Sequence, residues 1–323
     1  MSRLLITGAG GMLGRDLLAV LRTRDDLSVT ATTRTELDIT NPDAVRAAVT
    51  GHDLVINTAA WTNVDAAETQ EEAATAVNGN AVAHLATACA TTNARMIHIS
   101  TDYVFPGDAT QPYPEDAPTS PINAYGRSKL AGELAITQLL PHTGYIVRTA
   151  WLYGQHGPNF ITTILRLAHE RQWLDVVNDQ RGQPTWTYHL AEQLLALTGT
   201  ALADHAPPGI YHGTCSGQTT WYDLARAAFN LRGLNPDRIR PTTSDRYPRP
   251  APRPAYSVLA HQRWTAAGLQ PLPDWHAALA QALAPSASHM DSETSPPSQS
   301  ARSSSQEGNL KAANLAMTNP PRR

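Results

Sequence analysis

A tyrosine and a lysine four residues apart, Tyr125 and Lys129, have side chains whose types and spacing could do chemistry. Residues 125–140 are predicted to be helical, and positions i and i+4 of a helix lie on the same face. A phenol has a pKa of about 10, and a neighbouring cation lowers this pKa because it favours the phenolate. The pair could therefore move a proton to or from a substrate oxygen near neutral pH. Alone the spacing is a weak signal, since a packed ring and a solvated amine can share it.

A glycine-rich turn near the N-terminus is the first element that could supply a cofactor to this pair. An apolar strand at residues 4–6 leads into Gly8, Gly11 and Gly14, and a helix is predicted at residues 15–21. In this context the glycines allow a tight turn, close approach of a pyrophosphate and close packing of the helix on the strand. The phosphates would bind the free N–H groups at the helix N-terminus. We predict a dinucleotide site; a glycine-rich loop without a ligand is the alternative.

The end of the second predicted strand bears on which dinucleotide binds. NAD-specific sites usually carry Asp or Glu about 20 residues after the glycines, whereas this chain has Thr33 and Arg34. A hydroxyl followed by a guanidinium suits a 2′-phosphate. The sequence therefore favours NADPH, and NADH is the alternative cofactor. Arg34 could also simply point into solvent without binding a cofactor.

Alternating strands and helices occupy the first half of the chain. This pattern predicts an α/β protein with a Rossmann-type, doubly wound parallel sheet and a smaller C-terminal substrate-binding domain. We assign residues 1–151 and 173–204 to the dinucleotide-binding domain and residues 152–172 and 205–284 to the substrate domain. Ser, Pro, Gln and Asn dominate the remainder, so residues 285–323 are predicted to be disordered. Further strands are predicted at residues 29–34, 53–57, 96–105, 145–148, 174–177 and 210–212, and long helices at 68–90, 160–171, 188–202 and 221–231.

Bulk composition excludes several classes of protein. A formal net charge of −3 gives no electrostatic reason to expect nucleic acid or an anionic membrane as a partner. The only cysteines, Cys89 and Cys215, form no disulfide framework or zinc pattern, so a cytoplasmic location is expected. No apolar run approaches the ~20 residues that span a bilayer. No cluster of carboxylates or histidines has convincing ligand spacing, so no metal is predicted.

Several motifs in chain order resemble those of extended short-chain dehydrogenase/reductases, and most closely those of the dTDP-4-dehydrorhamnose reductases. The resemblance extends over residues 1–284 and is specific because the motifs occur together. It includes the glycine turn and the segments at residues 57–68, 100–105, 125–133, 148–151 and 253–257.

The resemblance implies NADPH-dependent reduction of the C4 ketone of a dTDP-4-keto-6-deoxy-L-sugar, which would be the small-molecule partner. It makes Tyr125 the proton donor to the developing alkoxide. Lys129 would lower the pKa of the phenol and hold the nicotinamide ribose, and Thr101 would hydrogen-bond the ketone oxygen. An antibiotic or rhamnose pathway fits this chemistry, and the chain could form a homodimer.

The resemblance also assigns binding residues one by one. Those for the substrate are Val64, Asp102, Tyr103 and Trp151, and core packing is the alternative for Trp151. Besides Tyr125 and Lys129, those for the cofactor are Gly8, Gly11, Met12, Leu13, Arg34, Asp38, Ile39, Ala59, Ala60 and Thr62.

Three other functions share this fold. A dehydratase would carry a second carboxylate where this chain has Tyr103, so elimination is disfavoured. A sugar-nucleotide epimerase, which keeps its cofactor bound, stays open. A non-catalytic NADP-binding regulatory subunit also stays open, although the intact set of Thr101, Tyr125 and Lys129 counts against it.

Overall fold

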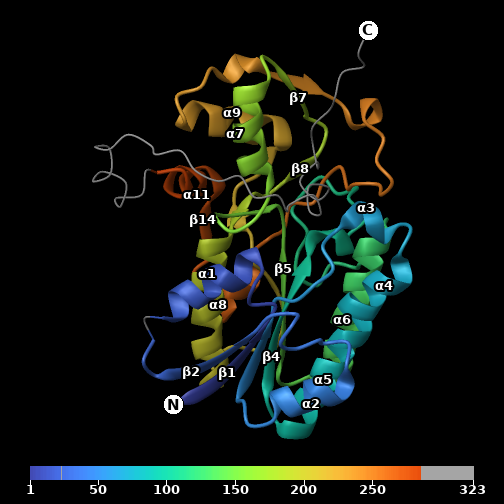
Figure 1. Ribbon diagram of the computed structural model, residues 1–323, viewed down its shortest axis with the longest axis vertical. Helices are drawn as coiled ribbons and strands as arrows, with labels where there is room; N and C mark the ends of the chain where they lie inside the picture. Colours follow the sequence, from blue (N-terminus) through green and yellow to red (C-terminus); the bar gives the residue numbers. More distant parts are fainter. Residues whose placement is uncertain (23, 285–323) are drawn as a thin grey trace, which may run out of the picture.

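A six-stranded parallel sheet organises the chain (Figure 1). The computed structural model describes residues 1–22 and 24–284, and the tail predicted at residues 285–323 lies outside the described residues. The strand order β10-β5-β4-β3-β1-β2 confirms the predicted α/β class with a doubly wound parallel sheet. Its strands are β1 (Ser2–Thr7), β2 (Leu27–Thr32), β3 (Leu54–Asn57), β4 (Arg95–Thr101), β5 (Gly144–Thr149) and β10 (Gly209–His212).

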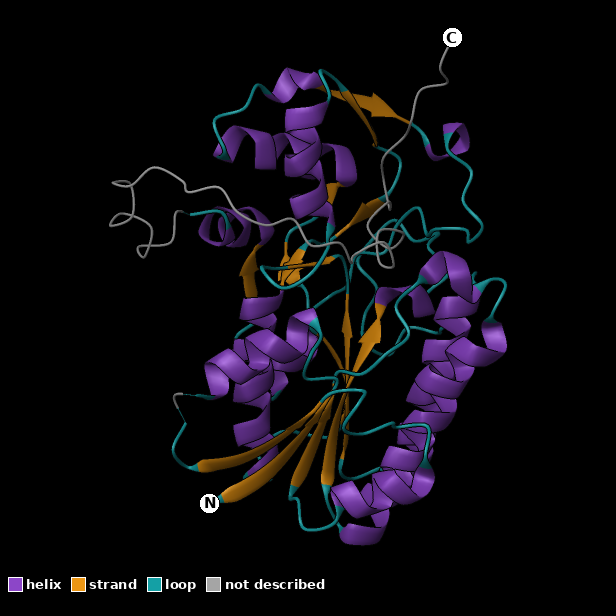
Figure 2. Cartoon of the chain, viewed as in Figure 1, coloured by secondary structure: helices purple, strands orange, loops and turns teal. Residues whose placement is uncertain are grey.

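Helices cover both faces of this sheet (Figure 2). Consecutive residues of β1 point to opposite faces: Leu4 and Ile6 pack in one apolar cluster and Leu5 in the other. A strand buried on both faces reads as a continuous apolar run, as 4–6 does. The first face carries α1 (Met12–Leu21) and α8 (Thr187–Leu202), and the second carries α2 (Pro42–Val49), α5 (Ala81–Thr92) and α6 (Ala124–Leu139).

A smaller cap stands over the carboxyl ends of the strands, at the top of Figure 1. It has an apolar core of its own, which includes the buried side chains of Ile164, Leu224 and Phe229. The cap is built from α7 (Phe160–Glu170), β7 (Leu174–Val177), α9 (Trp221–Leu231) and β13 (Ile239–Thr242), and α11 (Trp275–Ala282) packs against it through Leu279.

Two strands lie on the other side of the predicted domain boundary. The sequence places residues 174–177 in the dinucleotide-binding domain, whereas they form β7, which pairs in parallel with β13 of the cap. It places residues 210–212 in the substrate domain, whereas they belong to β10, which pairs in parallel with β5 at the edge of the main sheet. Both strands are short and apolar, and periodicity alone does not reveal which sheet such a strand joins.

The single helix predicted at residues 68–90 is interrupted. It consists of α4 (Glu71–Thr75), a π-helical turn η1 (Ala76–Asn80) and α5, after a short α3 (Val64–Ala67). Within the π turn, the Asn78 side chain accepts from the Trp61 N–H at 2.8 Å and donates to the Ser128 hydroxyl at 3.0 Å. The wider turn therefore ties the segment after β3 to α6.

The strand predicted to run through residue 105 ends at Thr101, where a 3₁₀ turn, η2 (Asp102–Val104), begins. The Thr101 hydroxyl accepts from the Tyr103 N–H at 3.2 Å, which caps the turn. Short elements connect the rest: β6 (Leu152–Tyr153), β8 (Arg181–Gly182), β9 (Thr185–Trp186), β11 (Cys215–Ser216), β12 (Thr219–Thr220), η3 (Pro236–Arg238), η4 (Ser244–Arg246), α10 (Gln262–Ala266) and β14 (Leu272–Asp274).

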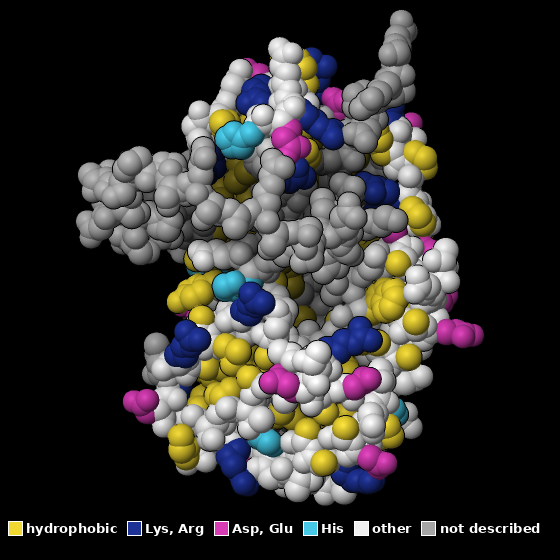
Figure 3. Space-filling view, in the orientation of Figure 1, with side chains coloured by type: hydrophobic (Ala, Val, Ile, Leu, Met, Phe, Trp, Pro, Cys, Tyr) yellow, Lys and Arg dark blue, Asp and Glu magenta, His cyan; other side chains and the backbone are white. Residues whose placement is uncertain are grey.

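Basic and acidic side chains are interspersed over the sheet-bearing part of the face in Figure 3. Among the described residues, every helix is too short or too polar to span a lipid bilayer.

Candidate active site

The glycine turn between β1 and α1 packs against the segment that follows β3. Gly8 has φ of +73°, and a Cβ there would lie 2.5 Å from the Ala59 backbone nitrogen. A Cβ on Gly14 would lie 2.6 Å from the Gly8 carbonyl oxygen. Only glycine fits either position, as the sequence predicted. The turn lies between neighbouring strands β1 and β3, where strand order reverses and α/β sheets bind ligands.

The N-terminus of α1 is suited to a pyrophosphate. Gly11 is the N-cap, and no side chain caps the helix. The first N–H groups of a helix have no intrahelical partner and attract anions. Met12 and Leu13, predicted to bind the cofactor, are the first residues of this helix. The residues present therefore fit a dinucleotide.

The predicted side-chain contacts to the cofactor lie in different environments. Arg34, Asp38 and Thr62 are exposed, Ala59 and Ala60 are half-buried, and Ile39 belongs to the buried core beneath α2 and α5. Thr33, next to Arg34, lies beside the glycine turn, since a Cβ on Gly10 would contact its methyl group at 3.4 Å. Their contacts with a cofactor stay predictions.

A carboxylate that the sequence reasoning missed lies at the end of β2. The Thr33 N–H and hydroxyl both donate to Glu36 Oε2, each at 2.8 Å. These bonds lower the pKa of Glu36, so it is ionised, two residues after Arg34 in the chain. A carboxylate favours a ribose 2′-OH and repels a 2′-phosphate, whereas Arg34 does the opposite.

The ends of β4 and α6 bring Thr101 and Tyr125 together. Thr101 lies close enough to the Tyr125 hydroxyl to lower its pKa, although burial raises that pKa more. The Tyr125 ring meets Tyr103 edge to face, with centroids 5.9 Å apart. Close docking of α6 makes this arrangement possible: a Cβ on Gly126 would lie 2.2 Å from the Tyr103 carbonyl oxygen.

Lys129 does not act on Tyr125 in the way the spacing predicted. Its ammonium nitrogen donates to the Ile99 carbonyl at 2.6 Å and lies 3.2 Å from His98 Nε2. Burial lowers the pKa of Lys129 to about 8. The pKa of Tyr125 is raised, first by burial and then by the charge of Asp102. The expectation of a lowered phenol pKa is therefore wrong for this structure, because Lys129 is turned toward β4.

A chain of hydrogen bonds from the sheet fixes the orientation of the His98 ring next to Lys129. Asn57 Oδ1 accepts from the Thr7 hydroxyl at 2.6 Å and from a backbone N–H. Asn57 Nδ2 therefore donates to His98 Nδ1 at 2.9 Å. Burial and the charge of Lys129 lower the pKa of His98, which keeps its ring neutral. Its proton then lies on Nε2, facing Lys129, and this polarity favours the neutral amine.

The predicted substrate residues separate into two groups. Val64 and Tyr103 are buried against each other and against Tyr125. Asp102 is buried beside Thr101. Trp151 instead stacks on Trp221 of α9, with ring centroids 3.6 Å apart, in the apolar cluster of the cap. Core packing thus accounts for Trp151, and its contact with a sugar stays a prediction.

Comparisons with known proteins agree with this geometry. The model of the RmlD substrate binding domain matches residues 2–288. The chain belongs to the dTDP-4-dehydrorhamnose reductase family. It is similar to a dTDP-4-dehydrorhamnose reductase of Streptomyces griseus, with 54% identity covering 87% of this chain and 93% of that protein. A dTDP-4-keto-6-deoxy-D-glucose reductase of Streptomyces niveus is 52% identical, covering 87% and 96%. A Bacillus anthracis dTDP-4-dehydrorhamnose reductase crystallised with NADP has a TM-score of 0.82 and 34% identity, covering 87% and 99%.

In this member of the reductase family, a C-terminal segment covers the catalytic edge. The Arg253 side chain is only 6% exposed and pairs with Asp65. Its charge lowers the pKa of Tyr103, which burial raises. The Ser257 hydroxyl also acts on Asp102 and lowers the pKa of that carboxyl. The sequence reasoning used residues 253–257 as a motif but gave them no place in the site.

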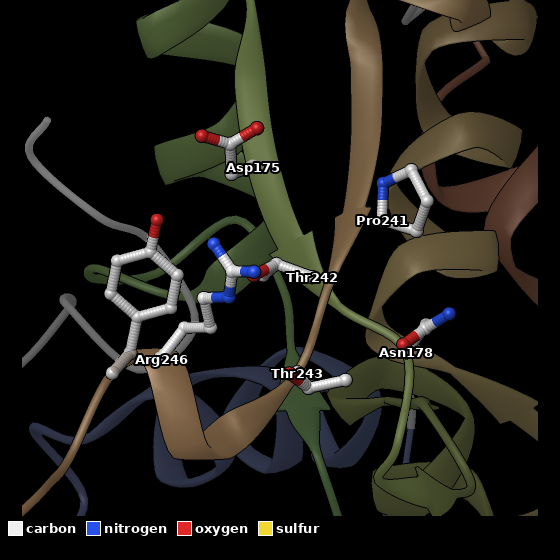
Figure 4. Close-up of a pocket in the computed structure, with 7 residues that line it drawn as sticks. Asp175, Asn178, Pro241, Thr242, Thr243 and Arg246 are labelled. Atoms are coloured by element: carbon white, nitrogen blue, oxygen red, sulfur yellow. The ribbon is translucent and has the colours of Figure 1, made fainter.

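The reductase also has a polar cavity of about 440 Å³ in its cap, away from the catalytic side chains (Figure 4). It lies beside β7 and β13, whose pairing was not foreseen, and none of its lining residues was predicted. It contains neither Thr101, Tyr125 nor Lys129, so the chemistry lies elsewhere. Its lining is formed by Asp175, Asn178, Pro241, Thr242, Thr243, Arg246 and Tyr247.

Across residues 1–22 and 24–284, no three His, Cys, Asp or Glu side chains gather in a way that could hold a metal ion. The expectation that no metal binds stays a prediction.

Proposed function

We infer that the chain is an NAD(P)H-dependent oxidoreductase that reduces the C4 ketone of a dTDP-4-keto-6-deoxysugar, in deoxysugar or rhamnose biosynthesis. The observation that carries this conclusion is the convergence of Thr101 and Tyr125 at the edge of the sheet that carries the glycine turn. The identity of more than half the residues with a curated reductase over 87% of the chain supports it.

The side chains divide the reaction between them. When bound, the nicotinamide would supply the hydride. Tyr125 gives its hydroxyl proton to the ketone oxygen as that oxygen gains negative charge. Thr101 stabilises the same charge by a hydrogen bond. Lys129, buried behind them, orients the nicotinamide ribose.

Tyr103 and Val64 form an apolar wall next to Tyr125, against which we place the 6-deoxy sugar. The wall leaves no second carboxylate where a dehydratase would need one, since position 103 is tyrosine. Ketone reduction needs one proton donor and a hydride, and this site supplies the donor.

We propose NADPH as the preferred cofactor because Arg34 lies exposed at the end of β2 and because the Bacillus anthracis relative was crystallised with NADP. The nearby carboxylate of Glu36 opposes this preference, so NADH remains a usable cofactor. A cytoplasmic location and a homodimer are further expectations of this proposal.

The proposal also concerns which sugar is the substrate. The two Streptomyces relatives are named for different 4-keto sugars, so we propose the dTDP-4-keto-6-deoxyhexose class, of either configuration. Purified protein should oxidise NADPH when mixed with a small panel of such sugars, and NMR of the products would identify the reduced carbon. No oxidation with any member of the panel would argue for the regulatory role. Stoichiometric oxidised cofactor in the purified protein would argue for an epimerase.

A further inference from the structure

The side chain of Asp102 is an unusual feature of the catalytic edge. It is only 2% exposed and directly follows Thr101. Its Oδ1 accepts a hydrogen bond from the Thr101 hydroxyl at 3.0 Å. Its Oδ2 is also buried, and no described residue donates a hydrogen bond to it. A buried carboxylate oxygen that lacks a partner costs far more free energy in an anion than in a neutral acid.

The Thr101 hydroxyl cannot donate a hydrogen bond to both Asp102 and a substrate ketone. This oxygen already accepts from the Tyr103 N–H. A hydroxyl has one proton and two acceptor sites. While Asp102 is ionised, that single proton points at Oδ1, so Thr101 offers only a lone pair to the ketone oxygen. Stabilising the developing alkoxide requires a donor instead.

We propose that Asp102 is a positioning residue that works as the neutral carboxylic acid, donating its proton to Thr101 Oγ1 and so directing the Thr101 proton to the substrate ketone. Thr101 then accepts from Tyr103 and Asp102 and donates to the ketone, which uses its full capacity. The role rests on the proposed ketone reduction.

The surroundings of Asp102 support the neutral form. The groups that act on it most strongly are hydroxyls and backbone N–H groups from Thr101, Tyr103 and Ser257, and none of these is a cation. Arg253 is paired with Asp65 and is not among the groups that act on Asp102. Burial outweighs these hydrogen bonds and raises the pKa of Asp102 to about 6. A sugar bound at this edge would displace water and raise the pKa further.

Neutral Asp102 would also help Tyr125 directly. The negative charge of Asp102 is the second cause that raises the pKa of Tyr125. Protonation of Asp102 removes that charge, so the phenol becomes a stronger acid when it must give up its proton. Both consequences make the protonated form the active one.

Variants at position 102 test the proposal. In Asp102→Asn the amide N–H can replace the acid proton as donor to Thr101, whereas Asp102→Ala offers none. We expect Asp102→Asn to lose about 3-fold in kcat and Asp102→Ala on the order of 10²-fold, as for a misdirected oxyanion donor. The wild-type kcat should fall as pH rises through the titration of Asp102, and the Asn variant should flatten that fall. Equal losses in both variants, or a wild-type kcat that rises over the same pH range, would overturn the proposal.

A double-mutant cycle with Thr101→Val tests the route. If Asp102 acts through Thr101, Asp102→Ala should cost little more once Thr101 is already Val. Full additivity of the two losses would contradict the route.

A direct titration separates this inference from the proposed function. Carboxyl ¹³C shifts of labelled Asp, assigned with Asp102→Asn, should show Asp102 still protonated above pH 5 in the wild-type protein, whether or not any sugar is reduced. Titration below pH 4 would overturn the inference even in an active reductase.

Discussion

The cofactor edge and the catalytic edge of this sheet are built in different ways. At the cofactor edge, glycines let backbone segments pack closely, and the charged side chains Arg34 and Glu36 are exposed. At the catalytic edge, Lys129 and Asp102 are buried and both have shifted pKa values. Exposed charges are screened and individually weak, while buried ones are strongly coupled to their neighbours. Substitutions at the catalytic edge should therefore have the larger effects.

Removing the proton donor should show this contrast most strongly. Tyr125→Phe keeps the ring and its packing on Tyr103 but loses the hydroxyl. We expect kcat to fall by about 10³-fold, within the range for general acid catalysis, with little change in the dissociation constant of NADPH measured by fluorescence. The matched control is Tyr222→Phe, whose ring lies on α9 of the cap near Arg226 and should leave kcat unchanged. Near-normal turnover of Tyr125→Phe would refute the assignment.

Backbone packing at the catalytic edge can be tested at Gly126. An added Cβ would lie 2.2 Å from the Tyr103 carbonyl oxygen, so α6 must shift. We expect Gly126→Ala to lower kcat by about 10²-fold through misplacement of Tyr125 and to destabilise the fold by about 1–3 kcal/mol.

Gly199→Ala is the control for that variant. Gly199 is also helical, in α8, but an added Cβ meets no atom within 4 Å. Alanine should there stabilise the protein by up to about 1 kcal/mol and leave kcat alone. Urea unfolding and initial rates of both variants check the pair, and equal behaviour would show that the close approach at Gly126 has no consequence.

The two edges also differ in how far the sequence predicted them. Gly8 and Gly14 could be interpreted correctly because their spacing and their place between a strand and a helix are local features. The direction of the Lys129 side chain could not, because it depends on His98 and Ile99, about 30 residues earlier on β4. Burial and long-range hydrogen bonds set these pKa values, and neither is visible in a motif.

The same limit explains the misplaced strands and the missed carboxylate. Strands β7 and β10 each have only four residues, so their sheet partners depend on packing. Glu36 escaped attention because it is three residues past Thr33 and folds back on it through a turn. The doubly wound sheet itself was predictable, since strand–helix alternation is repeated through the first half of the chain.

Burial of Lys129 predicts a pH dependence of stability. The folded pKa of about 8 lies below the usual lysine value of 10.5, so between these values the unfolded chain binds more protons. The free energy of unfolding therefore gains a contribution as pH rises from 8 to 10.5, worth roughly 3 kcal/mol at most. Lys129→Met should lack it. Urea unfolding of both proteins at pH 7.5 and 10 measures the difference, and parallel changes would show that Lys129 is not desolvated.

The smallest effects are expected at the cofactor edge, where two exposed charges oppose each other. Arg34→Ala should raise KM for NADPH about 10-fold, as for loss of one charge-assisted contact, and leave KM for NADH nearly unchanged. Glu36→Gln should lower KM for NADPH a few-fold, because it removes the carboxylate that repels the 2′-phosphate. Asp43→Asn, an exposed change on α2, serves as the control. Equal changes in KM for both cofactors in Arg34→Ala would mean that the 2′-phosphate does not bind near the end of β2. The proposed electrostatic difference between the two edges would then be wrong.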